Sequence, residues 1–161
     1  MLQNYTIQPL EAGRLAEALA LVKAVFMEFE APEFSEEGIE SFLKCIDIAL
    51  VQGQIDSSEL AVWTCRHNRK IVGVISITAR GHIRLLFVAA EHHRRGIARA
   101  LLQEGVKVFQ EKGFSQLTVN SSPYAVSIYQ HLGFGITQEE QCVNGIRFTP
   151  MTLCLTKLKP H

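Results

Sequence analysis

The most informative stretch of this chain is HHRRGIARALL, from His92 to Leu102. Two histidines and two arginines precede Gly96, and an apolar pattern at helical spacing begins directly after it. The first N–H groups of a helix have no partner inside the helix, and the helix dipole adds positive potential there. Gly96 lets a ligand approach the backbone closely, while Arg94 and Arg95 add charge. The stretch therefore predicts an anion site, and a solvated basic helix start is the simpler alternative.

The segments before this stretch follow helix and strand patterns in turn. Apolar residues at helical spacing from Leu15 to Phe29 predict a first helix, which ends in a loop around Pro32. Ser35 is placed to cap a second helix, whose apolar face runs to Ile46, and a polar loop follows it. Strands are predicted over residues 4–9, 59–67, 70–79 and 82–88, with Asn68–Arg69 as a two-residue turn.

The segments after this stretch continue the alternation. The helix that begins at Ile97 carries a buried stripe and ends at Lys112–Gly113; the stripe consists of Ile97, Ala98, Leu101, Leu102, Val106 and Phe109. Pro123 suits the start of a fourth helix and Gly133 suits its end. Further strands are predicted over 116–120, 134–142 and 145–156, the last two joined at Asn144–Gly145. Seven strands and four helices with only two strand–helix–strand crossovers predict a mixed α/β sheet.

Composition narrows the class of protein. The 161 residues predict a single domain over 1–161, and 47% of them are hydrophobic, as in a globular protein. Sixteen basic residues balance sixteen acidic ones, which argues against general nucleic-acid binding. No apolar run is long enough to span a bilayer, and the first residues lack the blocks of a signal peptide. We therefore expect a cytoplasmic protein with no membrane or nucleic-acid partner.

The cysteines and histidines show no ligand spacing. Four cysteines are scattered without a CxxC pair, and we interpret them as reduced core residues; they are Cys45, Cys65, Cys142 and Cys154. The histidines outside the basic turn and the central strand are also isolated. The sequence therefore predicts no catalytic metal.

Two motifs resemble a known family. HHRRGIA is similar to the acyl-CoA loop of the GNAT superfamily of N-acyltransferases, whose pattern is Gln/Arg-x-x-Gly-x-Gly/Ala, with His93, Gly96 and Ala98 in its first, fourth and sixth places. His93 departs from Gln/Arg, so a role for its side chain does not carry over. VNSSPYAVSIYQHLGF, from Val119 to Phe134, resembles the superfamily's Asn…Ala…Tyr…Gly-Phe segment. The element order also fits this fold, and the chain looks most like bacterial single-domain members of unassigned substrate.

The resemblance implies a mostly antiparallel sheet with one parallel pair at its centre. Strands 82–88 and 116–120 should be parallel neighbours that splay apart at their C-terminal ends. The pantetheine arm of acetyl-CoA would lie in that cleft against the backbone of Leu86, Phe87 and Val88. The diphosphate would sit on the amides of Arg94 to Ala98. The expected cofactor residues are therefore Leu86, Phe87, Val88, His93, Arg94, Arg95, Gly96, Ile97, Ala98, Arg99, Asn120 and Tyr124.

The resemblance also suggests which groups carry the chemistry. An amine that attacks a thioester must be neutral, and a proton donor near sulfur assists departure of the thiolate. Tyr129 holds the place of the family's general acid, although its spacing also fits a core aromatic, and Tyr124 is its rival. Asn120 is a candidate site residue at the end of its strand, where a structural cap is equally reasonable. His82 has a suitable pKa for a general base, but a surface histidine is the commoner explanation.

The acceptor is less defined by the sequence. Glu28, Glu30 and Glu33 lie in a stretch without basic residues, where an acidic rim would attract a cationic amine and a solvated face is the alternative. We expect an N-acetyltransferase that moves the acetyl group of acetyl-CoA to a small-molecule or peptide primary amine by direct attack in a ternary complex. A CoA-binding sensor and a non-CoA phosphate-binding domain are the alternatives. Homodimers are frequent in the resembled family, and the final strands are candidate edges.

Overall fold

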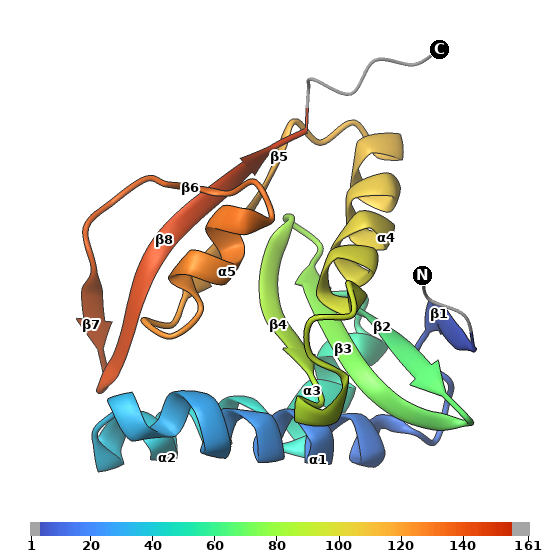
Figure 1. The fold of residues 1–161 in the computed structure, drawn as a ribbon, viewed down its shortest axis with the longest axis horizontal. Helices are drawn as coiled ribbons and strands as arrows, with labels where there is room; N and C mark the ends of the chain where they lie inside the picture. The colour runs from blue at the N-terminus through green and yellow to red at the C-terminus, as the bar shows by residue number, and fades with distance from the viewer. Residues whose placement is uncertain (1–3, 156–161) are drawn as a thin grey trace.

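The computed structural model describes residues 4–155, which form one sheet with helices on both of its faces (Figure 1). The strands run in the order β1-β2-β3-β4-β5-β8-β6, and β7 pairs with β8. Their bounds are β1 (Tyr5–Pro9), β2 (Leu60–His67), β3 (Lys70–Thr78), β4 (His82–Val88), β5 (Gln116–Ser121), β6 (Gly135–Ile136), β7 (Gln141–Val143) and β8 (Ile146–Cys154). The α-helices are α1 (Leu15–Val25), α2 (Glu36–Cys45), α3 (Ile48–Asp56), α4 (Ile97–Glu111) and α5 (Val126–His131).

The predicted architecture is confirmed. The sheet is mixed and mostly antiparallel, and β4 and β5 form a parallel pair at its centre. The two-residue turns also form as expected, because Asn68, Arg69, Asn144 and Gly145 all have positive φ. Within residues 4–155, no helix is both long enough and apolar enough to cross a bilayer.

Three predicted elements differ from the structure. The expected polar loop contains α3, which Asp47 caps by accepting a hydrogen bond from the amide of Leu50 at 3.1 Å. The strand expected over 134–142 is divided into β6 and β7. Pro150 on β8 has no N–H to donate to a partner strand, and pairing with β6 stops beside it at Ile136. The last helix begins at Val126 rather than at Pro123.

A bulge in β4 opens the centre of the sheet. Ser76 pairs with Leu85 and Ile77 pairs with Ile83, so Arg84 is an extra residue on β4. The parallel pairing of β4 with β5 includes only residues 82–83 of β4. Beyond this point the strands diverge, and Figure 1 shows α1 and α2 crossing below their open end.

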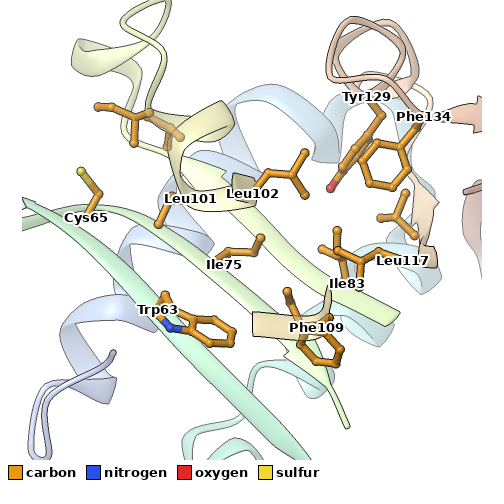
Figure 2. Close-up of a cluster of buried hydrophobic side chains, with 14 of the residues drawn as sticks. Trp63, Cys65, Ile75, Ile83, Leu101, Leu102, Phe109, Leu117, Tyr129 and Phe134 are labelled. Atoms are coloured by element: carbon orange, nitrogen blue, oxygen red, sulfur yellow. The ribbon is translucent and has the colours of Figure 1, made fainter. Parts of the chain in front are cut away.

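Apolar residues fill both faces of the sheet. On one face the buried side of α4 packs on β2, β3 and β4, and the cluster in Figure 2 includes Leu101, Phe109 and Ile75. On the other face α1 supplies Val22, and the turn that follows α1 supplies Phe26. Complete burial of one such side chain stabilises the fold by about 1.5–3 kcal/mol.

The expectation of core cysteines is wrong for three of the four. Cys65 alone among them is buried, on β2, whereas Cys45, Cys142 and Cys154 are exposed. Cys142 and Cys154 lie in the last strands near an edge of the sheet, and Cys45 ends α2.

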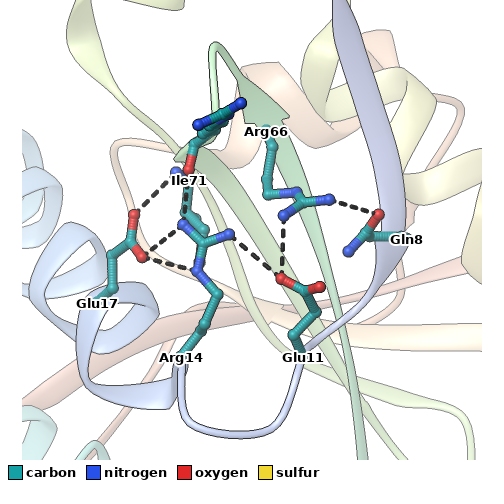
Figure 3. A network of polar contacts seen from close by, with 7 residues as sticks. Gln8, Glu11, Arg14, Glu17, Arg66 and Ile71 are labelled. Carbon is teal, nitrogen blue, oxygen red and sulfur yellow. Dashed lines mark hydrogen bonds and ion pairs between the residues drawn. The ribbon is translucent and has the colours of Figure 1, made fainter.

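A polar network fixes the start of α1 to the sheet (Figure 3). The guanidinium of Arg14 donates to the carboxylate of Glu17 at 2.7 Å, and Glu17 also accepts from the amide of Ile71 at 3.0 Å. The Ile71 amide, followed by Arg14, lowers the pKa of Glu17. Glu11 joins Arg14 to Arg66 on β2. The network orients α1, and with it the segment that leads to α2.

The turn of the last hairpin rests on α2. The Ser35 hydroxyl caps α2 by accepting from the amide of Gly38 at 3.1 Å, as predicted. A Cβ at Gly38 would collide with the carbonyl of Gly145, so the hairpin backbone lies directly against the helix. The hydroxyl of Ser41 donates to the carbonyl of Asn144 at 2.8 Å. These contacts bring β8 to the same side of the open centre as α2.

Candidate active site

A cavity of about 840 Å³ follows the first turn of α4 and the open edge of β4. Most residues predicted to bind the cofactor line this larger cavity: Leu86, Phe87, Val88, His93, Arg94, Gly96, Ile97, Ala98, Arg99 and Tyr124. Arg95 and Asn120 do not line it. The fold therefore gathers two separate predicted segments, the end of β4 and the basic turn, around one space.

The start of α4 has the geometry of an anion cradle. Gly96 is the N-cap residue with φ of 83°, a conformation that glycine adopts without strain. A Cβ at Gly96 would meet no atom within 4 Å, so the space over this turn is open. In the part of the chain that the structure describes, no backbone carbonyl accepts from the amides of Ile97, Ala98 or Arg99. Such amides are suited to phosphate oxygens.

His93 ties the basic turn to the end of β4. Its Nε2 donates to the carbonyl of Val88 at 2.7 Å, and its ring centroid lies 5.1 Å from that of Phe29. Phe29 in turn lies 5.5 Å from the ring of Tyr124. The side chain of His93 therefore positions the loop. The family pattern, which has Gln or Arg at this place, did not predict this contact.

A smaller cavity of about 330 Å³ lies between the sheet and the helices α2 and α3. Its lining includes Phe42 from α2, Val51 from α3, Ser76 from β3 and Phe148 from β8. The helix α3 and the docked hairpin thus supply two of its walls. The wall from α3 was not expected, because the sequence predicts a polar loop at these residues.

The two cavities meet at one place. Five residues line both of them: Glu30, Leu86, Phe87, Ala125 and Tyr129. Glu30 ends a π-helical turn, Phe26–Glu30, which follows α1, and Tyr129 comes from α5. A molecule in one cavity and a molecule in the other would therefore approach each other at these two polar side chains.

Tyr129 presents a protonated hydroxyl to the junction. The residue is 7% exposed and its ring packs at 5.2 Å from Phe134, so it is a core aromatic as well as a cavity residue (Figure 2). Its hydroxyl makes no hydrogen bond with residues 4–155. Burial, and then the charge of Glu30, raise its pKa. The hydroxyl is therefore a free donor at neutral pH.

Glu30 is the titratable acid of the junction. Burial is the main cause that raises its pKa to about 7, and the nearby charge of Glu33 adds to the rise. A hydrogen bond from Ser122 acts in the opposite direction. The carboxyl group therefore changes charge near neutral pH, where a general base is most effective.

The three predicted acidic residues separate in the structure. Glu28 and Glu33 are exposed and line neither cavity, while Glu30 lines both. The acidic rim is therefore not a shared feature of the three side chains. Glu28 and Glu33 fit the alternative interpretation, a solvated acidic surface. Glu30 differs from them because it is partly buried.

His82 and Asn120 line the smaller cavity alone. The Nδ1 of His82 is hydrogen-bonded to Thr118 Oγ1 at 2.7 Å, at the end where β4 and β5 remain paired. Burial, with a contribution from Arg84, lowers the pKa of His82 and keeps the ring neutral. Asn120 is exposed and pairs with Pro150 of β8. Neither residue lines the larger cavity.

Between residues 4 and 155, no three His, Cys, Asp or Glu side chains lie close enough to hold one ion. The polar groups at the junction are instead a carboxyl group and a phenol.

Comparison with known proteins adds the family. The model of the Acetyltransferase (GNAT) domain matches residues 30–155. The chain belongs to the GNAT acetyltransferase family. The match begins at Glu30 and includes both GNAT-like motifs, the α4 start and the segment that contains Tyr129.

Relatives of this GNAT chain agree with the assignment. An N-acetyltransferase of Escherichia coli K12, YafP, is 28% identical over 141 residues, 87% of each chain. Two mammalian N-acetyltransferases also match, and the chain spans about half of their length.

Solved structures of GNAT proteins share the fold. A GCN5-related N-acetyltransferase of Rhodopseudomonas palustris superposes with a TM-score of 0.81 at 19% identity, covering 96% of this chain and 98% of that one. The PaiA N-acetyltransferase of Thermoplasma acidophilum, in complex with coenzyme A, has a TM-score of 0.78 at 19% identity, covering 93% and 98%.

Proposed function

We propose that this GNAT protein transfers the acetyl group of acetyl-CoA to a primary amine by direct attack in a ternary complex. One observation carries the proposal: two cavities meet at Glu30 and Tyr129, so a donor and an acceptor can be held at once. The membership in the family supports the reaction type. Acetyl-CoA supplies an activated acyl group as a thioester.

The larger cavity fits the cofactor. The open space over Gly96 and the amides at the start of α4 would hold the diphosphate, with charge from Arg94 and, at the mouth, Arg95. The edge of β4 over residues 86–88 is not paired with β5, so its backbone groups can bind the amide groups of the pantetheine arm. Tyr124 would contact the cofactor beside Phe29. The similar PaiA N-acetyltransferase is known in complex with coenzyme A, which supports the choice of cofactor.

The junction supplies proton transfer in both directions. Glu30 would accept a proton from the ammonium form of the acceptor, which makes the nitrogen nucleophilic. The hydroxyl of Tyr129 would donate to the sulfur as charge develops on it, because its raised pKa keeps it protonated. His82 is the second candidate for the base, and Asn120 would contact the acceptor from β5. The proposed base thus comes from the segment that connects α1 to α2, and the proposed acid comes from α5.

Alternative functions have less support. A sensor that has lost turnover would not need a free tyrosine hydroxyl at the junction, and a phosphate-binding domain would not need a cavity of about 840 Å³ beside the helix start. The proposal is tested by thermal shift with acetyl-CoA, CoA and ATP, where only the first two should stabilise the protein. Release of free thiol in the presence of primary amines should then follow. Stabilisation without amine-dependent thiol release would favour the sensor, and stabilisation by ATP alone would favour the third function.

A further inference from the structure

The walls of the smaller cavity are largely aromatic and apolar, which restricts the kind of acceptor that fits. Four phenylalanines line it, Phe34, Phe42, Phe87 and Phe148, together with aliphatic side chains of α3, β2 and β4. Phe42 is stacked on Phe26 at 3.9 Å between ring centroids and lies 6.0 Å from Phe87. Rings held in this way form a rigid apolar wall, which favours a flat or compact apolar body over a hydrated chain.

The charges around the smaller cavity restrict the acceptor further. Glu30 is the one carboxylate among its lining residues, and it stands at the junction. Two cations line the remainder, Arg84 and Arg147. Arg147 is paired with Glu140 at 2.9 Å, whereas Arg84 forms no ion pair with residues 4–155. The cavity therefore offers a position for one ammonium group, and a second cationic group would meet the guanidinium of Arg84, an exposed residue that forms no ion pair with residues 4–155.

A buried hydroxyl marks the inner wall. Ser76 on β3 is fully buried, lines the cavity, and its Oγ has no hydrogen-bond partner within the described chain. A buried polar atom without a partner is costly and uncommon in folded proteins. This atom is suited to a hydrogen bond with one polar group on the far end of a bound molecule.

We propose that the smaller cavity selects a primary monoamine with a compact aromatic or branched apolar body, whose amino group lies at Glu30, in preference to a polyamine. The inference rests on the proposed function, because it assigns the acceptor side of the same site. The transfer balances with one amine: one proton of the ammonium group passes to Glu30, the nitrogen bonds to the acetyl carbon, and the C–S bond breaks. A second proton passes through Tyr129 to sulfur, and the third remains on the amide nitrogen.

Binding and turnover test the class separately. Isothermal titration of the protein saturated with CoA should give tighter binding for 2-phenylethylamine and tyramine than for spermidine. The kcat/KM from thiol release with acetyl-CoA should follow the same order, by about tenfold or more. If spermidine binds more tightly and reacts faster, the acceptor class is wrong while the acetyltransferase function stands. If an amine binds but none of the three amines causes thiol release, the proposed function fails instead. The order of the three affinities then still decides which class of amine the cavity selects.

Charge and hydrogen bonding are tested by substitutions with matched controls. Arg84→Glu should raise the ratio of kcat/KM for spermidine over 2-phenylethylamine by about tenfold, through attraction of the second cation. Arg80→Glu makes the same change in charge on an exposed turn that lines neither cavity, and it should leave the ratio unchanged. Ser76→Ala should weaken tyramine binding relative to 2-phenylethylamine. An unchanged ratio in Arg84→Glu, or the same shift in Arg80→Glu, would overturn the selection by charge.

Discussion

Glu30 and Tyr129 meet where the two cavities join, and the charge of Glu30 helps to raise the pKa of the Tyr129 hydroxyl. Burial raises the pKa of Glu30 to about 7 and raises that of Tyr129 above its usual value, so the phenol stays protonated where the carboxyl group titrates. Groups separated in this way are suited to act as base and acid in one reaction.

Tyr129→Phe should lower kcat by roughly 10²–10⁴-fold, the range for removal of a positioned acid. The ring remains, so its packing on Phe134 should survive and acetyl-CoA affinity should change little. Thiol release with a primary amine measures the loss, and the high-pH limb of the profile should change with it. Tyr124→Phe is the control and should retain most of the turnover. Full turnover in Tyr129→Phe would move the role of acid to Tyr124 or to water.

Glu30→Gln should remove the low-pH limb of the rate profile. In the unsubstituted protein, kcat/KM should rise with pH through about 7 as the Glu30 carboxyl group loses its proton. The groups that act on this carboxyl are Glu33, Ser122 and Tyr129. Glu33→Gln is the control, because Glu33 lines neither cavity, and it should preserve the limb with a slightly lower apparent pKa. Persistence of the same limb in Glu30→Gln would instead point to His82.

Glu30→Gln should also change how stability depends on pH. The pKa of this carboxyl is about 7 in the folded chain and 4.5 without perturbation, so the folded state binds more protons between these values. The stability of the unsubstituted protein therefore falls as pH rises from about 4.5 to 7 on account of this group. Glu30→Gln should raise Tm at pH 8 and lose this advantage below pH 4.5. Equal Tm differences at both pH values would contradict the burial of the charge.

Gly96→Leu should weaken the binding of CoA by about tenfold or more, because the side chain would fill the open space at the start of α4. Because Gly96 has a positive φ, a leucine at this position should also lower the free energy of unfolding by roughly 1–2 kcal/mol. Gly113→Leu is the matched control: it has φ of 91°, equally open surroundings, and lies beyond the other end of α4. Both variants should lose a similar number of degrees in Tm, and only Gly96→Leu should lose CoA affinity. Equal affinities in calorimetry would remove the diphosphate from this turn.

Gly38→Ala should separate the last hairpin from α2, because the new Cβ would collide with the Gly145 carbonyl. We expect a loss of about 1–3 kcal/mol in the free energy of unfolding and a raised KM for the amine. The Kd for acetyl-CoA should stay the same, since neither glycine lines the larger cavity. Gly53→Ala, at an open position in α3, is the control and should be neutral or stabilising. A raised acetyl-CoA Kd in Gly38→Ala would show that the hairpin affects both cavities.

Local patterns in the sequence determined most of the fold. The cap at Ser35, the turns at Asn68–Arg69 and Asn144–Gly145, and the stripe on α4 depend on residues near one another in the chain. The two motifs around Gly96 and Tyr129 were sufficient for the resemblance that the family match confirms. The helix α3 was missed because its apolar residues Ile48 and Leu50 are exposed, which obscures the helical pattern, although Asp47 was an available cap signal.

The tertiary structure alone decided which acidic residue and which walls belong to the site. In the sequence, Glu28, Glu30 and Glu33 are equivalent, and Glu30 differs only because the folded chain buries its carboxyl group beside Ser122. The wall of the smaller cavity joins α2, α3 and β8, which no local pattern connects. A pKa and a cavity depend on groups that are distant in the chain, so they appear only when the chain is folded. The sequence by itself predicts the anion site at the start of α4, because the amides and charges that would form it lie within a single turn.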